Sequence, residues 1–350
     1  DLFVALASKD TLSLNYTLSE PEAFGVHMDA ASLGDFSLQS MQASTKKEQE
    51  HYKKLLKFHP KRLNTEQQLI YKLLKKNFEL DLKYKDYSLY TEILGPTTGI
   101  QAQLPILLAE YKFYSRSDID NYLSILVDTA RYFNQICEFE RLKSKAGLFM
   151  SDEVALQIID QCRAFIDNPD KNYLIEYFNN KIIHFSNLSP TEKKSYIKKN
   201  ESNVKTYVIP AYESLIQTLQ ECMGTGTNPN GLANFSHGKD YYSYLVASYT
   251  GSDKSIEEMS QMLEHALETS LGTMSKVLKD DPNILKKINS YSYCKTEPTE
   301  ILDYLKTSIA DHYPDVPAVN CSIKEVHRSL QDHVSPAMYL IPPIDRYESN

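Results

Sequence analysis

The side chains best suited to metal chemistry lie in the run Glu264-His265-Ala266-Leu267-Glu268. On a helix, His265 and Glu268, or Glu264 and Glu268, share one face and can approach the same ion. The same spacing is typical of the solvated acidic face of an amphipathic helix, and we favour that interpretation. The stronger zinc signature, His-Glu-x-x-His, occurs nowhere among the nine histidines. We therefore predict no metal ligand in this chain.

Nucleophilic catalysis has no distinctive signature in the sequence. Gly-x-Ser-x-Gly is absent, and Ser-x-x-Lys occurs about as often as chance gives in a chain rich in both residues. Glu138 and Glu140 are two positions apart, so on a helix their carboxylates point to different faces and do not act as a pair. The glycines from Gly224 to Gly231 lack the preceding strand and the lysine of a P-loop. We predict a connector there and no catalytic residue in the chain.

Tyrosine is the most unusual feature of the composition, with 25 tyrosines and no tryptophan. A ring with a hydroxyl tip suits either a half-buried core or a polar-lined binding groove. Tyr244, in a helix predicted from about Gly238 to Ser248, and the nearby Tyr249 favour core packing, because both fall near the apolar face with Leu245. For Tyr241, Tyr242 and His237, which lie beside the glycine-rich loop, core packing and groove lining are evenly balanced. These three residues are the candidate substrate-binding residues of the sequence.

The elements that must position these residues are predicted to be helices. Capping signals precede four patterns of apolar residues at spacings of three and four, and they lie at Asn64, Ser115, Ser189 and Ser255. Pro210 falls inside a helical pattern and predicts a kink or short break near Val208. Later helices are predicted to begin near Pro298 and at Ser322.

No stretch shows the alternation of strand, loop and helix that is typical of an α/β fold, and no repeat of fixed period is visible. We therefore predict an all-α fold of about ten helices in one irregular, elongated helical domain with little or no β structure. No shift in composition indicates a linker, so we expect residues 1–350 to form a single helical region without an internal boundary.

Composition and charge narrow the classes of function. A net charge of −8 and a pI near 5.7 argue against nucleic acid or an anionic membrane as a partner, because such binders concentrate positive charge on one face. The five cysteines are widely spaced, so neither a zinc knuckle nor a dense disulfide framework is predicted. No apolar run is long enough to span a bilayer. Asp1 is not an initiator methionine, so we expect an upstream segment to have been removed.

Three stretches of the sequence carry a resemblance to a known family. The first runs from Asn230 to Glu258 and contains a Gly-Leu pair, a Tyr-Tyr pair and a Thr-Gly turn before an acidic helix start. The second runs from Gly95 to Pro105, and the third from Tyr339 to Asp345. In these stretches the chain resembles a large bacterial family catalogued as domain of unknown function 885, and the resemblance spans nearly the whole chain in order.

That resemblance implies a function. Full-length members of the family are similar to zincin metallopeptidases and carry a His-Glu-x-x-x-Gly-His type motif after the Pro-Pro-x-Asp segment. The resemblance therefore implies that this chain is the N-terminal portion of such a protein, ending at Asn350 before the zinc ligands and the catalytic glutamate. Zinc is expected in the full-length protein and no cofactor in this chain. The resemblance also implies a location outside the cytoplasm, with lipid anchoring at the cell surface in many members.

Two functions follow as expectations. In the first, the chain forms one wall of a cleft for a peptide or related small substrate, with Tyr241, Tyr242 and His237 lining the wall. Its partner is then the C-terminal half of the same polypeptide, and the chain is inactive alone. In the second, the chain is a non-catalytic helical binding or scaffold module at the cell surface. Zinc ligands encoded downstream of Asn350 would distinguish the first function from the second.

Overall fold

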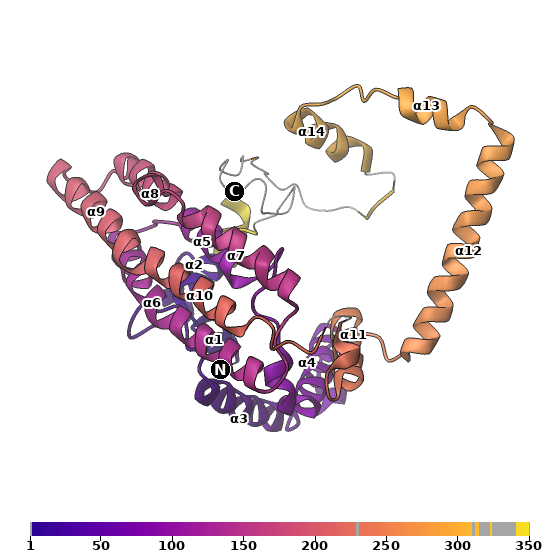
Figure 1. Ribbon diagram of the computed structural model, residues 1–350, viewed down its shortest axis with the longest axis horizontal. Coiled ribbons are helices and arrows are strands. Elements are labelled where there is room, and N and C mark those ends of the chain that lie inside the picture. Colours follow the sequence, from indigo (N-terminus) through magenta and orange to yellow (C-terminus); the bar gives the residue numbers. More distant parts are fainter. Residues whose placement is uncertain (1, 229–230, 310–311, 315–322, 324–340, 350) are drawn as a thin grey trace. The chain divides into compact units, whose positions relative to one another are not determined.

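The computed structural model describes residues 2–228, 231–309, 312–314, 323 and 341–349 (Figure 1). Within these residues the chain forms fourteen α-helices and no strand, which confirms the prediction of an irregular all-α fold. The helices are α1 (Leu2–Ala7), α2 (Thr11–Thr17), α3 (Leu38–Leu55), α4 (Thr65–Lys83), α5 (Ile100–Glu110), α6 (Arg116–Lys145), α7 (Asp152–Ile166), α8 (Tyr173–His184), α9 (Pro190–Asn203), α10 (Ile209–Cys222), α11 (Gly238–Thr250), α12 (Ile256–Asp280), α13 (Ile284–Ser290) and α14 (Pro298–Ser308). The helix predicted to begin at Ser322 lies outside the described residues.

All four predicted capping signals form. Each cap side chain accepts a hydrogen bond from the backbone N–H three residues on. The side chain of that third residue in turn accepts the backbone N–H of the cap residue. These capping boxes begin α4 at Asn64, α6 at Ser115, α9 at Ser189 and α12 at Ser255. Each box satisfies two N–H groups that the helix itself leaves without a partner, so the four helix starts follow from local sequence.

Pro210 separates two helices where the sequence predicts a break. α9 ends at Asn203, and a single π-helical turn, Val204–Val208, leads into α10. The ring of Pro210 removes one backbone donor and crowds the preceding turn, and a widened π turn accommodates both effects without ending the chain's helical course.

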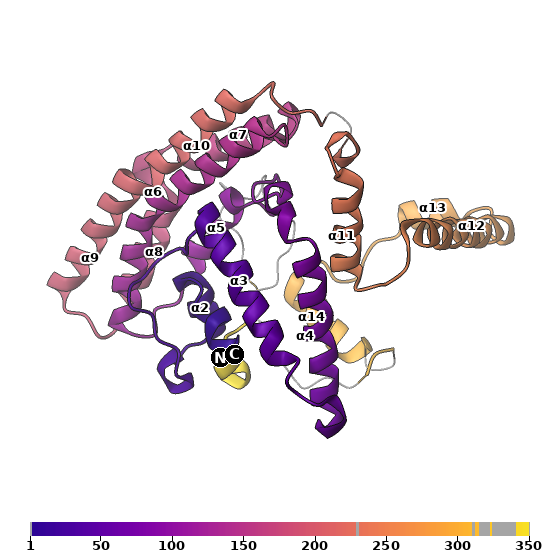
Figure 2. The same cartoon turned by 90° about the horizontal axis from the view of Figure 1, so that it is seen from below.

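The chain groups into two compact units, which are described separately: unit 1 comprises residues 1–242 and 326–349, and unit 2 comprises residues 243–325. The prediction that residues 1–350 form one region of a larger protein stays a prediction. In unit 1, α10 packs against both α6 and α7, α8 against α9, and α3 against α4 (Figures 1 and 2). The core between these helices is centred on Tyr212, whose ring lies 4.7 Å from that of Phe133 and whose hydroxyl donates to the carbonyl of Gln101.

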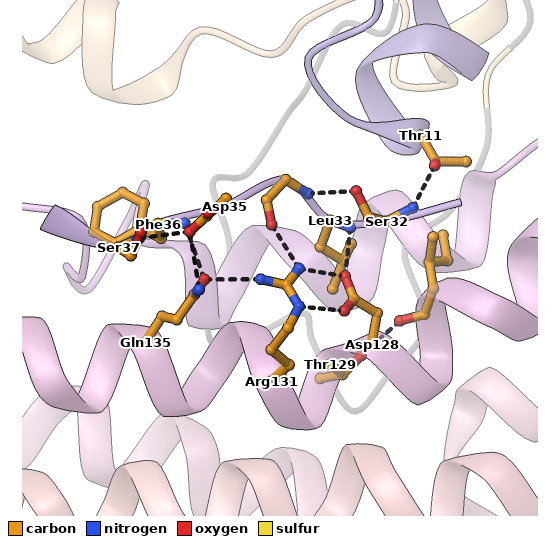
Figure 3. A network of polar contacts seen from close by, with 12 residues as sticks. Thr11, Ser32, Leu33, Asp35, Phe36, Ser37, Asp128, Thr129, Arg131 and Gln135 are labelled. Atoms are coloured by element: carbon orange, nitrogen blue, oxygen red, sulfur yellow. Dashed lines mark hydrogen bonds and ion pairs between the residues drawn. The ribbon is translucent and has the colours of Figure 1, made fainter. Parts of the chain in front are cut away.

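A polar network fastens the segment before α3 onto α6 (Figure 3). Arg131 donates to both oxygens of Asp128 and to the carbonyl of Gly34. Asp128 in turn accepts the N–H of Leu33 at 2.8 Å. Gln135 accepts the N–H of Phe36 at 3.0 Å. These bonds give the loop's backbone the partners that a strand or helix would otherwise provide.

This network positions the side chain of Phe36 against α6. Its ring lies edge-on to the ring of Phe139, with the centroids 5.3 Å apart. Phe139 is 2% exposed, so residues before α3 close the core over the C-terminal half of α6. The next residue along that helix is Glu140, whose burial is described below.

Candidate functional site

The 3₁₀ turn Lys85–Tyr90 and the two residues after it connect two unusual groups of side chains in unit 1. On one side lie aromatic rings at the start of α11. On the other lie a buried lysine and a buried glutamate of α6.

The aromatic group, here called the Tyr87 cluster, consists of Tyr87, Tyr90, Phe235, His237 and Tyr241. The ring of Tyr241 stacks on that of Tyr87, with centroids 6.0 Å apart and planes 15° from parallel. The ring of His237 meets the same Tyr87 ring edge-on at 6.4 Å. Tyr90 completes the group, 5.2 Å from Tyr241 and edge-on to Phe235. Pairs of this geometry add about 0.5–1.5 kcal/mol each beyond the burial of their area.

Local backbone geometry brings the loop before α11 against the helix start. Gly238 has its backbone so close to the carbonyl oxygen of Leu232 that an added Cβ would lie 1.7 Å from it. His237 has a φ of 55°, a left-handed conformation that is uncommon for a residue with a side chain. Its carbonyl accepts the N–H of Tyr241 at 3.0 Å, so the strained residue begins the helix. Tyr90 adds a bond from its hydroxyl to the carbonyl of Ser236.

The three residues predicted to bind substrate have different environments. Tyr241 is 6% exposed and holds the cluster together, whereas Tyr242, the next residue along α11, is 48% exposed. His237 is also exposed, and its Nδ1 lies 3.5 Å from a carboxylate oxygen of Asp240. Partial burial together with the negative charge of Asp240 raises the pKa of the Tyr87 hydroxyl. The structure therefore brings His237 and Tyr241 together through Tyr87, and their role in binding stays a prediction.

The second group consists of Glu92, Glu140 and Lys143, here called the buried charge cluster. Lys143 is fully buried in α6, and its ammonium donates to a carboxylate oxygen of Glu92 at 2.6 Å and to the carbonyl of Thr91 at 3.2 Å. Glu92 remains partly exposed. Thr91 and Glu92 directly follow Tyr90 in the chain. One short segment therefore carries both two tyrosines of the Tyr87 cluster and the partners of Lys143.

Glu140 is the least satisfied polar side chain of this region. It is fully buried, and both of its carboxylate oxygens are without a hydrogen-bond partner. Burial raises the pKa of Glu140 to about 7, with the positive charge of Lys143 opposing the rise and the negative charge of Glu92 adding to it. A carboxyl with a pKa near neutrality can hold or release a proton under ordinary conditions, as general acids and bases do.

Sequence reasoning missed the burial of Glu140, although a signal was present. Glu138 is exposed and Glu140 buried, which confirms that the two carboxylates face different sides. Glu140 falls on the apolar stripe of α6, four positions after Ile136 and seven after Phe133. A charged residue on such a stripe is the pattern that indicates a buried ionisable group.

The other two stretches that carry the family resemblance are each held by side-chain hydrogen bonds. In the loop Gly95–Gly99, the side chain of Gln101 donates to the carbonyl of Gly95 at 2.7 Å and to Gln161 at 2.9 Å. Near the end of the chain, the carboxylate of Asp345 accepts the N–H and the hydroxyl of Ser19. Residues 339–340 lie outside the described residues.

Metal ligands do not assemble in the described part of the chain. No three His, Cys, Asp or Glu side chains there lie close enough to hold a metal ion, and the predicted alternative for Glu264, His265 and Glu268, an exposed helix face, is what α12 shows. No helix of the described residues has the length and apolar character needed to cross a bilayer.

Fold and sites together define an all-α protein with an aromatic cluster on a loop and a buried ionisable group beneath the same segment. The family model "Bacterial protein of unknown function (DUF885)" matches residues 21–349, and the chain belongs to that family. A crystal structure described as "the putative lipoprotein from Colwellia psychrerythraea" has a similar fold, with a TM-score of 0.80 and 14% sequence identity. The match covers 99% of this chain and 65% of that one, so this chain spans about two thirds of its length. No curated protein matches the chain.

Proposed function

We propose that this chain forms the substrate-binding side of a zinc-dependent, peptidase-like hydrolase, and that the zinc ligands lie in polypeptide beyond the described residues. His237 and Tyr242 contact a peptide or related small substrate, and Tyr241 holds their loop in place. The observation that carries the proposal is the Tyr87 cluster, in which the ring of Tyr87 contacts the exposed His237 and the buried Tyr241 immediately precedes the exposed Tyr242. Rings of this kind give a binding surface large apolar area together with hydrogen-bonding groups.

The geometry of the cluster suits an extended peptide. Tyr241 is buried and stacked, so its position is fixed before any ligand binds, and a preorganised surface loses little conformational entropy on binding. Asp240 and His237 beside it offer an acceptor and a donor for backbone amides. We also place the protein outside the cytoplasm, which the "putative lipoprotein" description of the similar structure supports.

Fluorescence polarisation with fluorescein-labelled oxidised insulin B chain, an unstructured peptide with apolar and aromatic side chains, tests the proposal. We expect saturable binding to residues 1–350, weakened about tenfold by His237→Ala and by Tyr242→Ala, a loss typical of one interface anchor. Tyr249→Ala is the matched control, because Tyr249 lies on the same helix and is 88% exposed. The prediction of core packing was wrong for Tyr249, since the last turn of α11, residues 248–250, is exposed. Equal binding by all the variants, or no saturable binding, would refute the binding role.

Hydrolysis of the same peptide distinguishes the enzyme from the alternative, a non-catalytic binding or scaffold module. The complete reading frame of the gene is expressed, loaded with zinc and incubated with the labelled peptide, with and without a chelator. Cleavage that the chelator abolishes supports the hydrolase. Binding without cleavage would instead support the module, because the surface would then recognise peptides without chemistry.

A further inference from the structure

α12 is a long amphipathic helix in unit 2 that contains no buried side chain. Its apolar face carries Leu263, Leu267, Leu271, Met274 and Val277, at spacings of four, four, three and three. These side chains are between 44% and 71% exposed. Residues at these spacings lie on one face of a helix, so the exposed side chains form a continuous apolar stripe.

Within the described residues of unit 2, no buried side chain supports this helix. The described residues between 243 and 309 contain no buried residue, and α12, α13 and α14 each lack one. Isolated helices are marginal in water, and helices in proteins gain most of their stability from packing an apolar face. α12 is a capped helix of 25 residues with an apolar stripe. We therefore expect another surface to cover that stripe in the folded protein.

The charges of α12 distinguish between possible occupants of the stripe. Its first half carries Glu257, Glu258, Glu264 and Glu268 and no lysine or arginine. Helices that lie on membranes carry lysine and arginine on the polar face, so this acidic helix does not fit an anionic lipid surface. An apolar helix flanked by lysine or arginine would complement both the stripe and its acidic border.

We propose that the α12 stripe docks an amphipathic helical segment of the same polypeptide, equivalent to part of the "putative lipoprotein" chain that lies outside the match. About a third of that chain has no counterpart in these 350 residues, while the match covers 99% of them. The inference rests on the proposed function, in which additional polypeptide supplies the zinc ligands. It adds the surface on which that polypeptide packs and the chemistry of the docking segment.

Hydrogen exchange read by mass spectrometry compares residues 1–350 with the product of the complete reading frame. We expect α12 amides to exchange about 100-fold more slowly in the longer polypeptide, because covered helices open less often. In the longer polypeptide, Leu267→Asp removes this protection. Lys276→Gln retains it, because Lys276 is exposed and lies nine positions after Leu267, on the opposite face of the helix. In residues 1–350 alone, neither variant changes exchange in α12.

Four results would overturn the proposal. They are a reading frame that ends at Asn350, unchanged exchange in the longer polypeptide, protection of residues 1–350 that rises with protein concentration, and protection on addition of phosphatidylethanolamine and phosphatidylglycerol vesicles. The third result would assign the stripe to a second copy, and the fourth to lipid. Exchange reports docking without reference to activity, so a protected α12 in a protein that cleaves no peptide would retain this inference and reject the hydrolase.

Discussion

Glu140→Gln is the perturbation that tests the buried charge cluster most directly. The substitution keeps the size of the side chain and removes its ability to ionise. It breaks no hydrogen bond, since neither carboxylate oxygen has a partner. Lys143 keeps its bonds to Glu92 and Thr91. The variant therefore isolates the cost of ionising one buried carboxyl.

The magnitude follows from the pKa of Glu140, about 7 in the folded protein against an ordinary value of 4.5. Each pKa unit corresponds to about 1.4 kcal/mol, so the difference amounts to about 3 kcal/mol. Because the folded state holds the proton more tightly, the free energy of unfolding of the wild type falls as the pH rises from about 4.5 to about 7. Above pH 7 both states are ionised at this residue, and the penalty is constant.

Urea unfolding followed by circular dichroism at pH 5, 6, 7 and 8 measures the effect. We expect Glu140→Gln to match the wild type within about 1 kcal/mol at pH 5 and to exceed it by up to about 3 kcal/mol at pH 8. Glu138→Gln, two residues away and exposed, is the matched control and should follow the wild type throughout. A difference between Glu140→Gln and the wild type that is the same at pH 5 and pH 8 would refute the reasoning.

Three further predictions concern other parts of unit 1. Gly238→Ala places a Cβ 1.7 Å from the carbonyl oxygen of Leu232, so we expect the unfolding free energy to fall by about 1–3 kcal/mol and peptide binding to weaken. Thermal melts measure the change in stability and fluorescence polarisation the change in binding. An unchanged melting temperature would contradict the close approach. Arg131→Ala removes the bond to the carbonyl of Gly34 and the bonds that orient Asp128 and Gln135, and it should cost about 1–2 kcal/mol in urea unfolding. Arg163→Ala, at an exposed pair, should cost less than about 0.5 kcal/mol, and equal losses would contradict the network. Burial alone would raise the pKa of Asp345, but hydrogen bonds from Ser19 and Glu20 lower it. The stabilisation by the Asp345 carboxylate is therefore present above about pH 4 and is lost as the pH falls through the lowered pKa. Asp345→Asn should speed hydrogen exchange at residues 19–24 at pH 7, and equal exchange in variant and wild type would count against the contact.

Local signals in the sequence predicted the helix starts well. A cap and its third following residue are close in the chain, so the capping boxes at Asn64, Ser115, Ser189 and Ser255 form with little dependence on the remainder of the fold. The number of helices was underestimated. α13 has only seven residues, too few for a clear periodicity, and α5 begins without a side-chain cap and contains Pro105.

The sites depended on contacts that the sequence does not display. Tyr87 and Tyr241 are 154 positions apart, and only the folded chain shows that one ring stacks on the other. The pKa of Glu140 is raised mainly by burial among side chains of other elements, and the negative charge of Glu92, from a separate segment, adds to the rise. Helical periodicity likewise predicted the apolar face of α12 without showing that unit 2 leaves it uncovered.

The bond between Asp345 and Ser19 constrains when the fold can be completed during synthesis. The two residues are 326 positions apart, and a ribosome adding about 5–20 residues per second needs about 16 to 65 s to produce the second after the first. Throughout that interval the backbone around Ser19 and Glu20 lacks its carboxylate partner. The N-terminal corner around these residues can therefore reach its final hydrogen bonding only after nearly the whole of these 350 residues has been made.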